Sequence, residues 1–130
     1  MNILGIDFGT KNIGLAWVNT DLGVVLPFGI IKNHKSEIIN GELEKLIKEE
    51  NVNKIVVGLP TGLDGKENEN TKRIRNFSDE LKKLIKIPIE FADERFSSYA
   101  ADRMGSGGAS RDEKAAMVIL QTYLEMKKDK

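Results

Sequence analysis

Residues 5–16 read GIDFGTKNIGLA, an apolar strand pattern that ends in an aspartate, turns at a glycine and continues as a second apolar strand. Strand alternation places Asp7 on the same face as Ile3 and Gly5. A carboxylate on a buried strand face costs several kcal/mol unless hydrogen bonds or cations compensate it. The stretch therefore predicts a β-hairpin and marks Asp7 as a candidate functional residue.

Hydrophobic periodicity on either side of this hairpin predicts a mixed sheet. Pro27 cannot donate a ladder hydrogen bond, so its strand should lie at an edge or carry a bulge. The expected strands are an antiparallel meander over 2–8, 14–19 and 24–31, and parallel strands over 54–59 and 87–94. The expected helices cover 36–50, 74–85, a short stretch 96–104, and 111–127. We expect one α/β domain over residues 1–130, a central five-stranded mixed sheet with helices on both faces.

The composition narrows the possible chemistry. The chain has no cysteine and one histidine, His34, which excludes disulfides, thiolate metal sites and a multi-histidine zinc site. A metal would be held by oxygen ligands, which indicates Mg²⁺ or Mn²⁺. The formal net charge is zero, so nucleic-acid binding would depend on one local basic face. No apolar run approaches the length of a membrane span, and we expect a cytoplasmic protein without membrane contact.

Two further acidic positions lie where the pattern predicts burial. Glu94 ends the strand 87–94, next to Asp93, and alternation can aim only one of this pair at a given face. Asp112 begins a largely apolar face of the last helix, which continues through Ala116, Ile119 and Tyr123. A cluster of Asp7, Glu94 and Asp112 would supply oxygen ligands for one or two magnesium ions, the arrangement used for in-line displacement at phosphate esters.

Each acid also has a purely structural interpretation. Asp7 could cap the turn at Gly9 and Thr10 through its side chain. Ser110 and Glu113 match a capping box, which would place Asp112 in the first helical turn, where the helix dipole favours any acid.

The basic residues have alternatives of the same kind. Arg95 could clamp a phosphate, or could form a salt-bridge group with Asp93 and Glu94. Three residues of the second helix are expected on its solvated face: Lys72, Arg73 and Arg75.

Two glycines and an aromatic residue belong to the opening hairpin. Gly9 and Gly14 would let the chain turn tightly beside a metal and leave room for a nucleic-acid backbone. Trp17 alternates with Leu15, so we expect it in the core.

Four motifs in order, GIDFGTKNIGLA, VVGLPTGLDG, FADERFSS and RDEKAAMVILQTYL, resemble those of the YqgF family, also called RuvX. The resemblance covers nearly the whole chain. It implies a ribonuclease-H-like fold with an acidic metal site. It also implies an activity like that of Holliday-junction-resolvase-like nucleases, or of nucleases that mature the 5′ end of 16S ribosomal RNA.

The resemblance assigns roles residue by residue. It implies that Asp7, Glu94 and Asp112 are the catalytic and metal-binding acids. The residues expected to contact substrate are Thr10, Lys11, Arg95, Ser97, Ser98 and Arg111. Junction resolvases related to this family use a fourth carboxylate on the last helix, where this chain has Ala115 and Ala116. A four-acid site is therefore absent.

The function expected from these residues is metal-dependent cleavage of structured RNA, at the 5′ end of precursor 16S rRNA. The expected partners are nucleic acid and ribosomal particles, and the expected state is a monomer or weak homodimer. One alternative is a resolvase of four-way DNA, which would need a dimer to cut two strands symmetrically. Two others are half of an actin-like or sugar-kinase-like ATP-binding fold, of which the chain supplies only one half, and a non-catalytic nucleic-acid-binding module.

Overall fold

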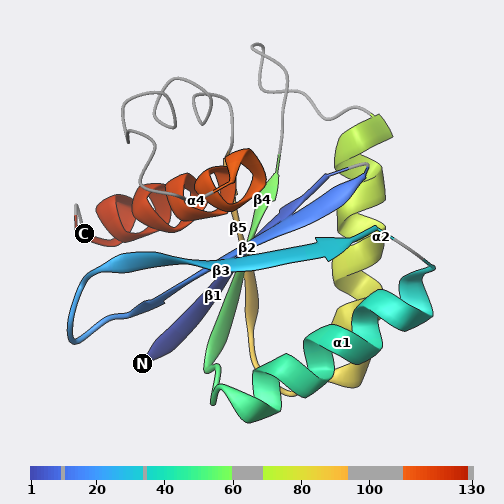
Figure 1. Ribbon diagram of the computed structural model, residues 1–130, viewed down its shortest axis with the longest axis horizontal. Helices are drawn as coiled ribbons and strands as arrows, with labels where there is room; N and C mark the ends of the chain where they lie inside the picture. Colours follow the sequence, from blue (N-terminus) through green and yellow to red (C-terminus); the bar gives the residue numbers. More distant parts are fainter. Residues whose placement is uncertain (10, 34, 60–68, 94–109, 129–130) are drawn as a thin grey trace.

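A computed structural model describes residues 1–9, 11–33, 35–59, 69–93 and 110–128 (Figure 1). Its strands are β1 (Asn2–Phe8), β2 (Asn12–Asn19), β3 (Val25–Lys32), β4 (Lys54–Leu59) and β5 (Ile89–Asp93). Its helices are α1 (Ser36–Glu49), α2 (Glu69–Leu84) and α4 (Arg111–Lys128). The short helix expected over 96–104 lies outside the described residues. The α/β class and the five-stranded mixed sheet are confirmed.

The five strands form one sheet in the order β3-β2-β1-β4-β5. β1 pairs antiparallel with β2, and β2 with β3, while β4 runs parallel to β1 and β5 parallel to β4. The expected meander and the edge position of the Pro27 strand are both confirmed. The register of β2 against β3 shifts between Leu15, which pairs with Gly29, and Ala16, which pairs with Pro27, so β3 has a bulge at this point. Because β1, β4 and β5 run parallel to one another, their C-terminal ends lie at the same end of the sheet. We call this end of the sheet the carboxyl edge.

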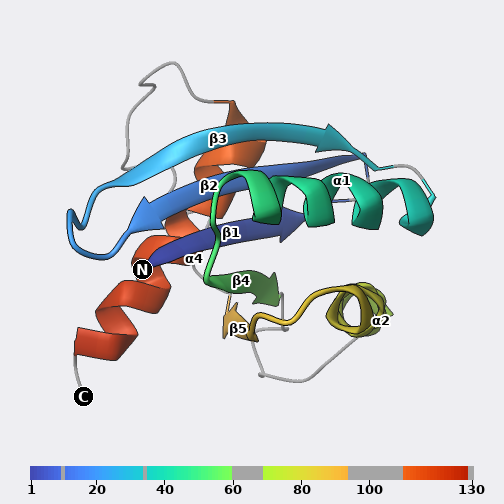
Figure 2. The same ribbon diagram turned by 90° about the horizontal axis from the view of Figure 1, so that it is seen from below.

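Helices cover both faces of the sheet (Figure 2). On one face, α1 and α2 bury a core with alternate residues of β1, β2 and β4, among them Leu4, Ile6 and Phe8. On the other face, α4 packs on Ile3 and on neighbouring residues of β2, β4 and β5. Within the described segments, no helix is both long enough and apolar enough to cross a membrane.

α4 lies directly on the first strand because β1 carries a glycine at the contact. A Cβ atom on Gly5 would lie 2.5 Å from Cγ of Leu120 and 3.1 Å from the carbonyl oxygen of Ala116. Any larger residue would push the helix away from the sheet. This contact sets how closely α4 lies on the sheet, and its first turn lies near the carboxyl edge.

Some element boundaries differ from the expected ones. α2 begins at Glu69, five residues before Ile74, the first apolar residue of the expected helix. Thr71 in this extra part is fully buried, so its hydroxyl-bearing side chain fills a core position that a hydrophobic pattern misses. β5 begins at Ile89, two residues later than expected, after Pro88. Trp17, expected in the core, is only half-buried.

Candidate active site

Asp7 lies near the end of β1, on the face covered by α4. It shares this face with Ile3, which packs with α4, and with Gly5, which touches the helix. Its neighbour across the hairpin is Gly14, the residue paired with it in β2. The carboxylate is half-buried, so it can meet a ligand from solvent at the carboxyl edge. The face predicted for Asp7 is confirmed.

The turn that follows Asp7 is made by main-chain atoms. The Gly9 amide donates to the backbone carbonyls of Asp7 and Asn12, each over 3.1 Å. The capping role considered for the Asp7 side chain would require its carboxylate to accept that hydrogen bond. At Gly9 this alternative is therefore wrong.

Asp112 lies in the first turn of α4. The predicted capping box is present: the Ser110 amide donates to Oε1 of Glu113 over 3.1 Å, and the Glu113 amide donates to Oγ of Ser110 over 3.2 Å. This box fixes where the helix begins, and so where Asp112 sits. Its position suits both the helix dipole and a functional site, and the two interpretations are compatible.

Gly14 brings the two aspartates together. A Cβ on Gly14 would overlap the carbonyl oxygen of Asp112 and would lie 3.1 Å from the Asp112 Cβ. Gly14 is also the β2 partner of Asp7, so the two acids flank the same glycine. The expectation that Gly14 leaves room for a nucleic-acid backbone is wrong, because the backbone of α4 fills that space.

Asn12 completes this group and was missed in the sequence. Its Nδ2 donates to Oδ2 of Asp112 over 3.4 Å. A polar residue at the first position of β2 gave no sign of this contact, which joins residues 100 positions apart. Among the described residues, Asn12 is the side chain that hydrogen-bonds the Asp112 carboxylate.

The local donor set suits a hard cation. Asp7 and Asp112 offer carboxylate oxygens, the ligands that Mg²⁺ and Mn²⁺ prefer. Among the described residues, neither acid takes part in a salt bridge. The same residues contain no complete group of three metal-ligating side chains. Glu94, the third predicted ligand, lies outside them, directly after the end of β5 at Asp93.

The predicted substrate contacts are only partly described. Lys11 in the hairpin turn and Arg111 at the start of α4 are both exposed. The others, Thr10, Arg95, Ser97 and Ser98, lie outside the described residues.

Three basic residues were expected on the solvent-exposed face of α2, and this prediction is confirmed for two of them. Lys72 and Arg75 are exposed, and Arg75 also lies over the Phe91 ring, 5.2 Å from its centroid. For Arg73 the expectation is wrong. Its side chain is half-buried, and its guanidinium donates to the Phe8 carbonyl over 3.3 Å.

A second charged group lies between α4 and the N-terminal ends of β4 and β5, at the end of the sheet opposite the carboxyl edge. This group was not predicted from the sequence either. Lys54 Nζ donates to the Tyr123 hydroxyl over 2.9 Å and lies 3.4 Å from Oε2 of Glu90. The Tyr123 hydroxyl donates to the same Glu90 oxygen. The hydrogen bond with Tyr123 is the largest cause that raises the pKa of Lys54. Burial, the second-largest cause, lowers this pKa, and the charge of Glu90 makes a further, smaller contribution that raises it. We call these three residues the amino-edge triad.

The fold is ribonuclease-H-like, as a solved structure shows. The chain matches the structure described as "T. thermophilus RuvC in complex with Holliday junction substrate" with a TM-score of 0.70. The match covers 97% of this chain and 96% of that one at 14% sequence identity. At that identity the likeness speaks for the fold alone.

The chain belongs to the RuvX family. The family model described as "RuvX: Holliday junction resolvase" matches residues 1–126. A relative from Dictyoglomus turgidum is 41% identical over 136 residues, covering 96% of this chain and 94% of its own length. One from Maridesulfovibrio salexigens is 37% identical over 132 residues, covering 95% and 98%. Both relatives are named "Putative pre-16S rRNA nuclease". The family resemblance drawn from the four motifs is confirmed.

Proposed function

We propose that this chain is a divalent-metal-dependent endonuclease that cleaves structured RNA and processes the 5′ end of precursor 16S rRNA. The observation that carries the proposal is that two acidic residues, Asp7 and Asp112, flank the same glycine, Gly14. The choice of substrate is supported by the names of the two relatives.

The proposed ligands are Asp7, Asp112 and Glu94, holding Mg²⁺ or Mn²⁺. A bound divalent cation would supply a water of lowered pKa and would neutralise charge at the scissile phosphate. Asn12 keeps the Asp112 carboxylate in one orientation through its donated hydrogen bond. Glu94 is included because the family resemblance assigns it to the acidic site, and in the sequence it directly follows Asp93, the last residue of β5.

Basic and hydroxyl-bearing residues around this edge are proposed to hold the RNA. Lys11, in the hairpin turn after β1, and Arg111, at the start of α4, are both exposed, so their charges can meet backbone phosphates near the site. The remaining proposed contacts are Thr10, Arg95, Ser97 and Ser98, and of these Arg95 would stabilise charge that develops at the phosphate.

The test is cleavage of a 16S rRNA fragment with a 5′ extension in Mg²⁺ or Mn²⁺. Asp7→Asn should fold normally and lose at least about a hundredfold in cleavage rate, because several kcal/mol of charge stabilisation would go with the ligand. Asp21→Asn is the matched control, since Asp21 is an exposed residue beyond the opposite end of β2. Equal cleavage by the two variants would remove the proposal.

The second candidate is resolution of four-way DNA, favoured by the description of the matching family model. It predicts paired symmetric nicks on a four-way junction, and a dimer that makes them. Equal cutting of a junction and a linear duplex would count against it.

A further inference from the structure

A pocket lies on the face of the sheet opposite Asp7, at the same carboxyl edge. Its volume is about 270 Å³, and Phe8 lines it from the end of β1. Phe8 directly follows Asp7, and alternation turns the two side chains to opposite faces of the strand. A nucleic-acid strand that crosses this edge could therefore contact both Asp7 and the pocket with neighbouring parts of one nucleotide.

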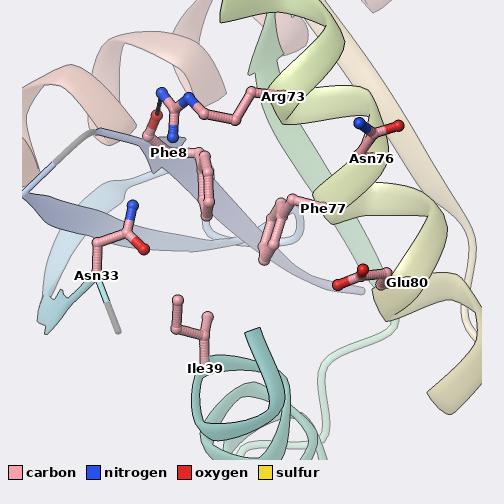
Figure 3. A pocket seen from close by; sticks show the side chains of 7 residues that line it. All are labelled: Phe8, Asn33, Ile39, Arg73, Asn76, Phe77 and Glu80. Atoms are coloured by element: carbon pink, nitrogen blue, oxygen red, sulfur yellow. Dashed lines mark hydrogen bonds between the residues drawn. The ribbon is translucent and has the colours of Figure 1, made fainter. Parts of the chain in front are cut away.

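The floor of the pocket is apolar and fixed. Phe8, Phe77 and Ile39 are all buried, and the two phenylalanine rings stack with centroids 4.3 Å apart and an interplanar angle of 20°. Figure 3 shows these three side chains between α1, α2 and the end of β1. Such a floor gives a planar aromatic ligand a preformed apolar surface.

Arg73 closes the end of the pocket next to the catalytic residues. Its guanidinium carbon lies 4.7 Å from the centroid of the Phe8 ring, and its Nη2 donates to the Phe8 carbonyl over 3.3 Å (Figure 3). The planar cation is thereby held against the residue that follows Asp7. Guanidinium planes stack on bases and also bind phosphates, so either part of a nucleotide suits this position.

The rim carries hydrogen-bonding groups on opposite sides. Asn33 is held in place where its Nδ2 donates to the Gly9 carbonyl over 2.7 Å. Asn76 and Glu80 are exposed on α2 across the pocket (Figure 3). Amides and carboxylates are the groups that read base edges: asparagine pairs with adenine, and glutamate accepts from the amino group of cytosine.

We infer that this pocket binds one unpaired nucleobase of the RNA substrate. The inference rests on the proposed function, and it places the base beside the scissile phosphate but on the other face of β1. The pocket is slightly below the roughly 300–1,000 Å³ of typical ligand sites, which suits a single base. Its apolar floor, planar cation and polar rim match how proteins bind splayed-out RNA bases.

The direct test is an NMR titration with the four nucleoside 5′-monophosphates and with ribose 5-phosphate. We expect at least one nucleotide to shift the amide signals of Asn33, Asn76 and Phe77, while ribose 5-phosphate leaves them in place. Asn76→Ala and Glu80→Ala should each weaken the preferred nucleotide by about tenfold, the equivalent of one base-edge contact. Asp79→Ala is the matched control, because Asp79 is the exposed neighbour of Glu80 outside the pocket lining.

Three outcomes would overturn the inference. They are no shift with any nucleotide at millimolar concentration, equal shifts with ribose 5-phosphate, and equal losses for Glu80→Ala and Asp79→Ala. The titration reads no cleavage, so it separates the pocket from the proposed nuclease activity. If the nucleotides bind here while Asp7→Asn cleaves RNA normally, the pocket stands and the proposed catalytic site fails.

Discussion

The two ends of α4 hold acidic groups in opposite ways. Near its C-terminal end, Tyr123 binds Glu90 together with a lysine, Lys54, so the acid has a cation and a hydrogen-bond donor in the chain itself. At its N-terminal end, Asp112 and the nearby Asp7 have no salt bridge among the described residues. An acid that serves stability brings its own compensation. Acids without a cationic partner fit a site where an external cation supplies the charge.

The largest effect on stability is expected where α4 touches the sheet. In Gly14→Ala the new methyl would overlap the Asp112 carbonyl oxygen, so the helix must move, and we expect the free energy of unfolding to fall by about 3 kcal/mol. Gly41 is exposed on α1 and has open space around it, so in Gly41→Ala the free energy of unfolding should rise by about 1 kcal/mol. Guanidinium denaturation of both variants measures this, and a neutral Gly14→Ala would contradict the close approach.

The amino-edge triad should be the next most sensitive place. Tyr123→Phe removes the hydroxyl between Lys54 and Glu90, and we expect a loss of about 2 kcal/mol because a partly buried charged pair loses a hydrogen bond. A double-mutant cycle with Glu90→Gln separates this interaction from packing. The two losses should fail to add by at least about 0.5 kcal/mol, and simple additivity would show that the triad does not act as a unit.

The triad also predicts a pH dependence. The folded state raises the pKa of Lys54 above its ordinary value of about 10.5. The stabilisation is therefore fully present below that value, and it is lost as the pH rises through the higher folded-state pKa. We expect denaturation experiments between pH 8 and 11.5 to show that the free energy of unfolding falls more steeply for the wild type than for Lys54→Met at the alkaline end of this range. Parallel curves for the two proteins would contradict the raised pKa.

The smallest effects are expected at the proposed catalytic acids. Asp112→Asn loses only the helix-dipole contribution, about 0.3–1 kcal/mol, and Asp7→Asn should be neutral or slightly stabilising in the absence of divalent ions. Melting curves recorded with a chelator measure this. A loss as large as that of Tyr123→Phe would mean that these acids, too, are structural.

Much of this arrangement follows from local sequence patterns. Period-two alternation gives the face of Asp7, and the spacing of Ser110 and Glu113 gives the start of α4. The contact of Gly14 with Asp112 could not be predicted, because it depends on how closely a helix from the other end of the chain settles on the hairpin. The buried Thr71 was missed for a related reason, since its burial depends on packing and not on its polarity.

The amino-edge triad shows the same limit more strongly. Its three side chains come from β4, β5 and α4, and each of them alone fits an ordinary surface or core position. Only the parallel pairing of β4 with β5, with α4 across them, brings the lysine and the glutamate to one hydroxyl group. Two parallel strands were expected here, but neither their pairing with each other nor the register that aligns these residues was.

Calorimetric titration with Mn²⁺ tests the central claim most directly, because it asks which end of α4 binds a cation. The wild type and Glu90→Gln should bind Mn²⁺ with similar affinity, and Asp7→Asn should bind it at least about tenfold more weakly, the loss of about 1.4 kcal/mol of binding free energy. If Asp7→Asn binds Mn²⁺ as tightly as the wild type, the carboxyl edge is not the metal site.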